Sequence, residues 1–238
     1  MRVLAIDTST RSCSIAIVDG SDLLAEITSG NGQTHSRHLM AMIDSSLEMA
    51  GLNLSEINGL AFTSGPGSFT GLRIGISTIL GLSAATGKPI AGISGLDALA
   101  MQAAAPDILI CPMIDGRRNE VYSARYRWVN EDLVKEMAEQ VLPPEIAITG
   151  VDTPALFAGN GAQLYQALIR DRLGDGARFA LECQNTLRAS TVAWISMKRF
   201  ENGDVDDIYT FEPMYIRKPD AKIPAPFIAR EPAHERTH

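Results

Sequence analysis

The sequence predicts an α/β protein with two units, each a mixed β-sheet flanked by helices. Over the first hundred residues, short apolar runs typical of strands alternate with longer segments of helical spacing, in the order β-β-β-α-β-α-β-α. From residue 106, a strand, a polar loop and a returning strand repeat the layout of residues 3–18 without repeating its sequence. A chain of 238 residues, 45% of them hydrophobic, can bury the core of one large or two small domains.

Composition and charge exclude several classes of protein. The net charge of −7, from 28 acidic and 21 basic side chains, argues against a dedicated nucleic-acid binder. The three cysteines, Cys13, Cys111 and Cys183, are far apart and form no C-x-x-C motif, which is typical of a reducing compartment and of no structural metal. The first residues lack a signal-peptide core, and the apolar stretch 69–85 is too short and, with Arg73, too polar for a membrane span. We expect a cytoplasmic protein without a membrane segment.

The first unit opens with three strands, expected over residues 3–6, 13–18 and 23–29. A tight polar loop joins the first two strands and consists of Asp7, Thr8, Ser9 and Thr10. Such side chains also form ordinary Asx and hydroxyl turns, so the loop alone is a weak indication of a site.

A helix is expected from residue 33 to Gly51, with its apolar side chains at helical spacing. His35 and His38 lie on its first turn and could form half of a metal site. No third ligand stands nearby in the sequence, so we interpret them as exposed histidines rather than metal ligands.

A strand over residues 57–62 leads into a glycine-rich stretch, Thr63–Gly75, which predicts a sharp turn and a helix N-terminus capped by Ser68. The turn has two interpretations, an anion cradle or a simple chain reversal. The helix, expected over residues 69–86, carries Gly71, Gly75 and Gly81, and each interior glycine costs about 1 kcal/mol relative to alanine. Close approach of another backbone, from this chain or from a second subunit, would explain them.

The remaining elements complete one unit and build a second. The first unit, residues 1–104, ends with a strand over 90–93 and a helix over 97–104; the second, residues 105–217, contains strands over 108–114, 120–128 and 155–158, a weak strand or loop over 133–140, helices over 143–148, 164–173 and 189–202, and an extended piece over 213–217. Its last helix is a candidate to pack back on the first unit. From residue 218, prolines and mixed charges predict a disordered tail.

Four stretches of the chain together resemble the TsaB (YeaZ) family. They are Asp7–Thr10, Ser64–Gly75, Asp115–Tyr122 and Pro213–Arg217, in the family's order and spacing. These bacterial proteins take part in the synthesis of N6-threonylcarbamoyladenosine at position 37 of tRNAs that read ANN codons. The resemblance runs from Met1 to about Arg217 and implies the actin-like, sugar-kinase and Hsp70 (ASKHA) type of fold, with two related α/β lobes.

The superfamily also implies where a nucleotide would bind. Phosphates are held by the first hairpin loop and its counterpart in the second lobe, and a later glycine turn meets the adenosine. The matching positions are Asp7, Thr8, Ser9, Thr10, Gly116, Arg117, Gly159 and Gly161. The second loop departs from the pattern, because Arg117 and Arg118 stand where a glycine pair would admit phosphate. No cofactor is assigned, and ATP or ADP at a degenerate or inter-subunit site stays open.

The resemblance implies a scaffold rather than a catalyst. The catalytic paralogue TsaD binds metal through two histidines at i, i+4, and the corresponding positions here are Gly95 and Leu99, which cannot ligate a metal. We therefore assign no catalytic and no metal-binding residue. The expected partners are a TsaD-type subunit, bound as a heterodimer, a TsaE-type ATPase, and tRNA through the assembly, with a homodimer open for the isolated chain. The residues expected to meet the TsaD-type subunit are His35, Leu39, Met42, Gly71, Gly75, Thr78 and Leu82.

Two enzymatic alternatives stay open. A small-molecule kinase of the same superfold would use Asp7 to place Mg²⁺ and Asp115 as the base that accepts a hydroxyl proton. A metallopeptidase would need a usable His-x-x-x-His pair, which the sequence lacks.

Overall fold

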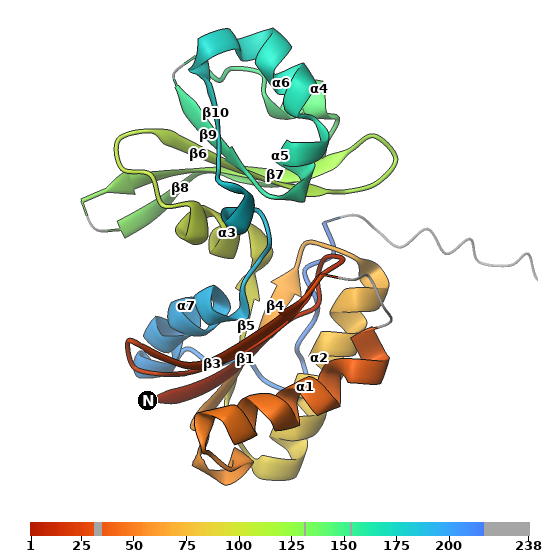
Figure 1. The fold of residues 1–238 in the computed structure, drawn as a ribbon, viewed down its shortest axis with the longest axis vertical. Coiled ribbons are helices and arrows are strands. Elements are labelled where there is room, and N and C mark those ends of the chain that lie inside the picture. The colour runs from red at the N-terminus through yellow and green to blue at the C-terminus, as the bar shows by residue number, and fades with distance from the viewer. Residues whose placement is uncertain (31–34, 131, 153, 217–238) are drawn as a thin grey trace, which may run out of the picture.

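The computed structural model describes residues 1–30, 35–130, 132–152 and 154–216, and it shows two lobes, each built on a five-stranded sheet (Figure 1). The sequence-predicted tail from residue 218 lies outside the described residues. The first lobe contains the N-terminus, and the second lobe follows it in the chain.

The first sheet has the strand order β3-β2-β1-β4-β5. Its strands are β1 (Arg2–Asp7), β2 (Cys13–Asp19), β3 (Asp22–Ser29), β4 (Gly59–Gly65) and β5 (Ile90–Ser94). The hairpin β1–β2–β3 is antiparallel, whereas β4 and β5 join β1 in parallel through helical crossovers. The carboxyl ends of β1 and β4 therefore lie at one edge of the sheet, which brings the polar loop after Asp7 next to the glycine-rich turn after β4.

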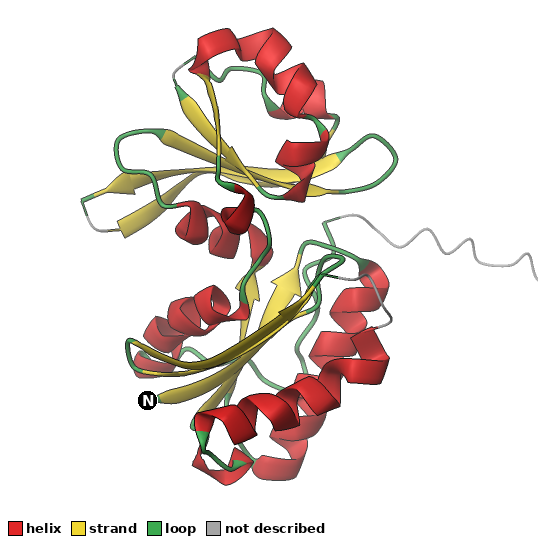
Figure 2. Ribbon diagram, in the orientation of Figure 1, coloured by secondary structure: helices red, strands yellow, loops and turns green. Residues whose placement is uncertain are grey.

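Helices cover both faces of the first sheet (Figure 2). On one face, α1 (His35–Ala50) and α2 (Phe69–Thr86) pack over Leu4 and Ile6. On the other face, α7 (Ala189–Glu201) packs over Val3 and Ala5. The alternation of side chains along a strand supplies both apolar faces from one sequence.

Helix α2 reaches the length and hydropathy of a membrane span, with 18 residues and a mean hydropathy of 1.2. The sequence-based statement that this stretch is too short and too polar for a membrane span was therefore wrong about its length and hydropathy. One face of α2 packs against β1, β4 and β5, so the helix serves as part of the first lobe's core.

The second sheet has the strand order β10-β9-β6-β7-β8. Its strands are β6 (Leu109–Asp115), β7 (Val121–Val129), β8 (Asp132–Leu142), β9 (Ala155–Ala158) and β10 (Ala177–Phe179). Its outer face is covered by α4 (Pro144–Ala147), α5 (Asn160–Leu164) and α6 (Gln166–Leu173). The described residues also form three short 3₁₀ turns: η1 (Leu54–Glu56), which follows α1 in the first lobe, and η2 (Gly174–Gly176) and η3 (Glu182–Gln184), which follow α6.

Three elements of the second lobe differ from the sequence-based prediction. The segment expected as a weak strand or loop is β8, a strand of 11 residues that pairs with β7 along its length, with register shifts near Arg125. The helix expected over 164–173 is α6, and a separate short helix that was not predicted, α5, precedes it and ends at Leu164. Strand β10 was not predicted, because three residues are too few to show an alternation.

The two lobes share a hydrophobic core. Helices α3 (Gly95–Ala103) and α7 lie between the sheets (Figure 1), and one buried cluster contains Val3 and Ala61 of the first sheet together with Ile110 and Tyr126 of the second. Since α7 follows the second sheet in the chain, the last helix returns to the first lobe.

The chain after α7, residues 204–216, runs back along the first lobe and is named here the C-terminal strap. Asp206 N donates to the carbonyl of Ile90 at 2.9 Å. Further along, the ring of Phe211 meets that of Phe62 edge to face, with 4.9 Å between ring centres. The strap thus crosses β5 and β4 toward the glycine-rich turn.

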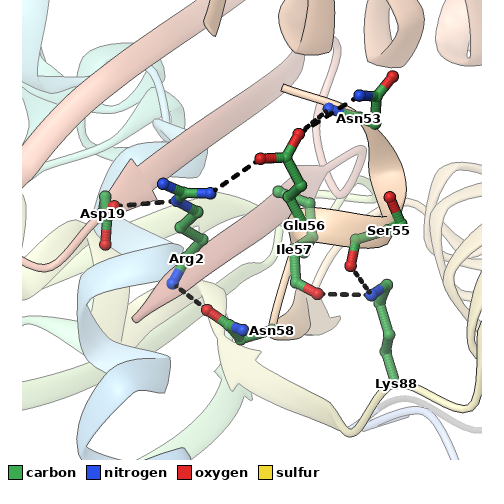
Figure 3. A network of polar contacts seen from close by, with 8 residues as sticks. All are labelled: Arg2, Asp19, Asn53, Ser55, Glu56, Ile57, Asn58 and Lys88. Carbon is green, nitrogen blue, oxygen red and sulfur yellow. Dashed lines mark hydrogen bonds and ion pairs between the residues drawn. The ribbon is translucent and has the colours of Figure 1, made fainter. Parts of the chain in front are cut away.

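A polar network closes the opposite end of the first sheet (Figure 3). Arg2 Nε donates to Asp19 at 3.0 Å and a terminal nitrogen of Arg2 donates to Glu56 at 3.2 Å, while Arg2 N donates to Asn58 Oδ1 at 2.8 Å. Lys88 Nζ donates to backbone carbonyls of the η1 region. Chiefly the hydrogen bond from Arg2 holds the pKa of Asp19 below its ordinary value. The network ties β1, β2 and η1 together, away from the candidate site.

Candidate functional site

The glycine-rich stretch forms the predicted turn and helix start. Strand β4 ends at Gly65, and Ser68 caps α2 by accepting a hydrogen bond from Gly71 N at 3.3 Å. Ser68 N in turn donates to the carbonyl of Ser9 at 2.7 Å. The start of α2 is therefore bound directly to the polar loop between β1 and β2.

Three glycines of this stretch allow that loop to lie against α2. A Cβ at Gly67 would fall on the carbonyl oxygen of Ser9. At Gly71 it would meet the carbonyl oxygen of Thr8, and at Gly75 it would meet the Thr8 hydroxyl. The close approach that the glycines predicted is thus made by this chain's own loop.

This geometry corrects part of the predicted partner interface. Gly71 and Gly75 are buried against Thr8, so they face the interior of the first lobe and not a second protein. Gly81, by contrast, is exposed, and a Cβ there meets nothing within 4 Å. Helical spacing puts Gly71 and Gly75 on one face of α2 and Gly81 on another, but the sequence does not show which face the loop covers.

The side chains of the predicted first phosphate loop are engaged within the lobe. Asp7, Thr8 and Ser9 are at most 3% exposed. Thr8 Oγ1 donates to the carbonyl of Gly71 at 2.8 Å, and Ser9 donates to Asp7 Oδ1 through its hydroxyl at 2.6 Å and its N–H at 3.1 Å. Thr10 Oγ1 lies 2.8 Å from Ser12 Oγ. The loop is an Asx turn covered by α2.

The corresponding loop of the second lobe is an exposed left-handed turn. Arg117, Arg118 and Asn119 have φ values of 62°, 55° and 57°. Left-handed backbone costs roughly 1–2 kcal/mol for each residue with a Cβ. Asp115 Oδ1 accepts the N–H of Arg117 at 2.8 Å, which stabilises the turn, and the Arg117 side chain is 74% exposed. Gly116 is buried below it.

The structure brings this turn together with the predicted glycine turn. Asn160 Oδ1 accepts the N–H of Asp115 at 3.1 Å. Gly159 and Gly161 pack on β6, where added Cβ atoms would lie 2.5 and 2.9 Å from the carbonyl oxygen of Met113. The second-lobe candidates thus form one cluster, held by Asn160, which the sequence analysis had not singled out.

A groove of about 490 Å³ runs between α1 and α2 on the outer side of the first lobe. It is lined by Leu39, Met40, Phe69, Thr70, Arg73, Ile74, Ser77 and Thr78. Among these, Met40 is 49% and Phe69 38% exposed, so large apolar side chains lie open at the surface. These two neighbouring side chains make the groove a candidate contact surface.

The predicted partner residues are distributed unevenly around this groove. Leu39 and Thr78 line it, although Leu39 also belongs to the buried core. Met42 and Leu82 are half-buried against the first-lobe core and do not line the groove. The side chain of His35 lies outside the described residues. The groove is also lined by Met40, Phe69 and Arg73, which were not among the predicted partner residues, although the open face of two amphipathic helices was the signal that could have added them.

Helix α3 contains Gly95 and Leu99, the positions that the sequence analysis matched to the expected metal ligands of TsaD. Gly95 is the first residue of α3 and Leu99 is 1% exposed in the core shared by the lobes. In the part of the chain that the structure describes, no three His, Cys, Asp or Glu side chains are grouped to hold a metal ion. Burial, and to a smaller extent the charge of Asp7, raises the pKa of the Cys13 thiol to about 12, so this thiol is not a nucleophile at neutral pH.

Comparison with known proteins places the chain in a family. The family model of TsaD, tRNA N6-adenosine threonylcarbamoyltransferase, matches residues 26–225. The chain is 32% identical over 226 residues to the tRNA threonylcarbamoyladenosine biosynthesis protein TsaB of Escherichia coli, covering 91% of this chain and 95% of the relative.

Solved structures agree with this placement. YeaZ from Pseudomonas aeruginosa superimposes with a TM-score of 0.77 at 28% identity, over 90% of this chain and 99% of that one. Component A of the (R)-2-hydroxyglutaryl-CoA dehydratase of Acidaminococcus fermentans, an actin-like protein, superimposes with a TM-score of 0.52 at 12% identity, over 84% and 98%, which confirms the two-lobed ASKHA fold. The chain belongs to the TsaB (YeaZ) family and takes part in tRNA threonylcarbamoyladenosine biosynthesis.

Proposed function

We propose that this chain is a non-catalytic partner that binds a TsaD-type transferase through the groove between α1 and α2. The observation that carries the proposal is the groove itself, because it leaves Met40 and Phe69 open on two helices that already cover their own sheet. A protein helix with an apolar face fits such a surface. In this role the chain positions the transferase for N6-threonylcarbamoyladenosine formation at A37 of tRNA.

The site geometry supports a binding role over catalysis. Gly95 and Leu99 stand on α3 where metal ligands would be needed, and neither side chain can donate to a metal. The kinase alternative requires Asp7 to reach Mg²⁺, but Asp7 is 0% exposed and bound by Ser9 beneath α2. The metallopeptidase alternative has no grouped ligands in the described part of the chain.

The remaining partners follow from the same proposal. A TsaE-type ATPase and tRNA bind the assembly of the two subunits in the cytoplasm. We place a nucleotide at the boundary between subunits, because Asp7, Thr8 and Ser9 of the first loop are buried beneath the chain's own helix. In the absence of the transferase, two copies of this chain could pair through their open grooves as a homodimer.

The direct test is a reconstitution of the modification. It combines tRNA, threonine, bicarbonate, ATP and the other Tsa proteins, with and without this chain. We expect threonylcarbamoylated tRNA only when the chain is present. Product formation at an equal rate without it would contradict the proposal, and phosphoryl transfer by the purified chain alone would favour the kinase alternative.

A matched pair of variants tests whether the transferase binds at the groove. Thr78 lines the groove and Thr86 lies exposed at the far end of the same helix, and each hydroxyl donates to the carbonyl four residues earlier. Thr78→Trp should block pairing with the transferase and reduce product formation, whereas Thr86→Trp should preserve both. Equal pairing by the two folded variants would contradict the assignment of the groove.

A further inference from the structure

Arg73 lies in the wall of the α1/α2 groove, one helical turn after Phe69. Its guanidinium carbon is 3.8 Å from the centre of the Phe69 ring, and its Nε donates to the Tyr215 hydroxyl at 3.4 Å. The rings of Phe69 and Tyr215 are themselves 5.2 Å apart. Stacking on an aromatic face orients the planar guanidinium, so the cation is held in the groove wall before any partner arrives.

The C-terminal strap holds this arrangement in place. Met214 N donates to the carbonyl of Ser64 at 2.9 Å, which positions Tyr215 beside the start of α2. Gly65 permits the approach, since a Cβ there would lie 2.6 Å from the carbonyl oxygen of Met214. Part of the glycine-rich motif thus serves to orient Arg73 through the strap.

Arg73 has no ion-pair partner in the described part of the chain. The other side chains that line the groove are uncharged: Leu39, Met40, Phe69, Thr70, Ile74, Ser77 and Thr78. An exposed, oriented cation in an otherwise neutral and largely apolar groove favours an occupant with one negative group at the matching position.

The surroundings of Arg73 suit a carboxylate better than a phosphate. Phosphate sites gather several donors, commonly the free N–H groups of a helix N-terminus. Arg73 is the fifth residue of α2, beyond those N–H groups, and the nearby Thr78 hydroxyl already donates to the carbonyl of Ile74 at 2.8 Å. One planar guanidinium matches one carboxylate in a bidentate pair.

We infer that Arg73 is the specificity-determining residue of the groove: it accepts a partner helix whose apolar face fills the groove and whose Asp or Glu carboxylate pairs with the guanidinium. The inference rests on the proposed function of the groove and names the chemistry that decides which helix is accepted. A helix without that carboxylate would leave the guanidinium desolvated and unpaired, which opposes binding.

The test measures the Kd for the TsaD-type transferase with the full chain and three variants. Arg73→Glu should weaken binding about 30-fold or more, since losing a close interfacial charge pair costs about 2 kcal/mol or more. Arg73→Lys should fall between, because an ammonium keeps the charge but not the planar fork. Arg172→Glu, at an exposed arginine of α6 in the second lobe, is the matched control and should bind within about twofold of the wild type.

Salt dependence and charge reversal complete the test. Raising the salt concentration should weaken the wild type more than Arg73→Glu. The paired carboxylate of the transferase is found by changing each exposed Asp and Glu of its docking helices to lysine in turn. In the Arg73→Glu background, the change at the paired position should restore binding.

Equal Kd values for Arg73→Glu and Arg172→Glu would overturn the inference while leaving the groove's proposed function intact. Absence of binding by the wild type would instead refute the proposed function. Loss of ATP binding in Arg73→Glu with an unchanged Kd for the transferase would assign the arginine to phosphate and overturn the inference.

Discussion

At the scale of single residues, α2 lies close to the β1–β2 loop because the helix has glycines, which carry no side chain, where the two meet. Gly71 lets the carbonyl of Thr8 approach the helix backbone, and the Thr8 hydroxyl donates back to the Gly71 carbonyl at 2.8 Å. Gly81 lies on the same helix with open space around it. Packing therefore requires a glycine at position 71 but not at position 81, so alanine substitution should have opposite effects on stability at the two positions.

Gly71→Ala should destabilise the protein by about 1–3 kcal/mol or more, because the added Cβ falls on a backbone carbonyl that cannot move without shifting the loop. Gly81→Ala should stabilise it by about 0.5–1 kcal/mol through better helix propensity. Urea denaturation of the two variants and the wild type measures both free energies of unfolding. Destabilisation by both substitutions alike would contradict the packing described for Gly71.

Cysteine reactivity offers a second test at this scale. Burial raises the pKa of the Cys13 and Cys111 thiols to about 12, while Cys183 is exposed. A thiol reagent at pH 8 should label one cysteine of the native chain quickly and all three only after unfolding in guanidinium. Rapid reaction of all three at pH 8 would contradict the burial.

At the scale of elements, the first lobe was largely predictable because its signals are local. Short, largely continuous apolar runs predicted β1 and β2, and Ser68 together with the glycines predicted the start of α2. The orientation of Gly71 and Gly75 was not predictable, since it depends on a loop sixty residues away in the chain. Strand β8 was predicted only as a weak strand or loop, because its charged and exposed residues resemble those of a loop.

Helix α7 shows another dependence on distant residues. Its own N-cap residue, Arg188, supplies no side-chain cap. Instead the Glu26 carboxylate of β3 accepts the Ser190 N–H at 3.0 Å and the Ser190 hydroxyl at 2.8 Å, and it pairs with Arg188. Ser14 of β2 accepts the Ala189 N–H at 3.0 Å. The first sheet thus caps a helix that the chain reaches only after the second lobe.

Glu26→Gln should destabilise the protein by about 1–3 kcal/mol, because it removes a buried negative charge from a helix N-terminus and from Arg188. Glu201→Gln, at the exposed end of the same helix, removes the same charge without those partners and should change the free energy of unfolding by less than about 0.5 kcal/mol. Thermal and urea unfolding compare the two. Equal effects would show that the anchor of α7 lies elsewhere.

At the scale of the whole molecule, α3 and α7 join the lobes through one hydrophobic core, so we expect the lobes to unfold cooperatively. The core around Leu99 includes Val3 of the first sheet and Tyr126 of the second. The Tyr126 hydroxyl donates to Asp97 of α3 at 2.6 Å, and burial, followed by the charge of Asp97, raises the pKa of Tyr126 far above its ordinary value. A core shared in this way suits the proposed scaffold, since it ties the lobe that carries the groove to the other lobe.

The two tryptophans of the chain report on this cooperativity, because Trp128 lies on β7 of the second lobe and Trp194 on α7 of the first. In Trp128→Phe and Trp194→Phe, the fluorescence of the remaining tryptophan and the far-UV circular dichroism should lose their native signals at the same urea concentration. Leu99→Ala, which empties part of the shared core, should lower the stability by about 2–5 kcal/mol and shift both fluorescence transitions together. A shift of the Trp128 transition alone would mean that the second lobe unfolds by itself, and the lobes would then be separate domains joined by a hinge rather than one scaffold.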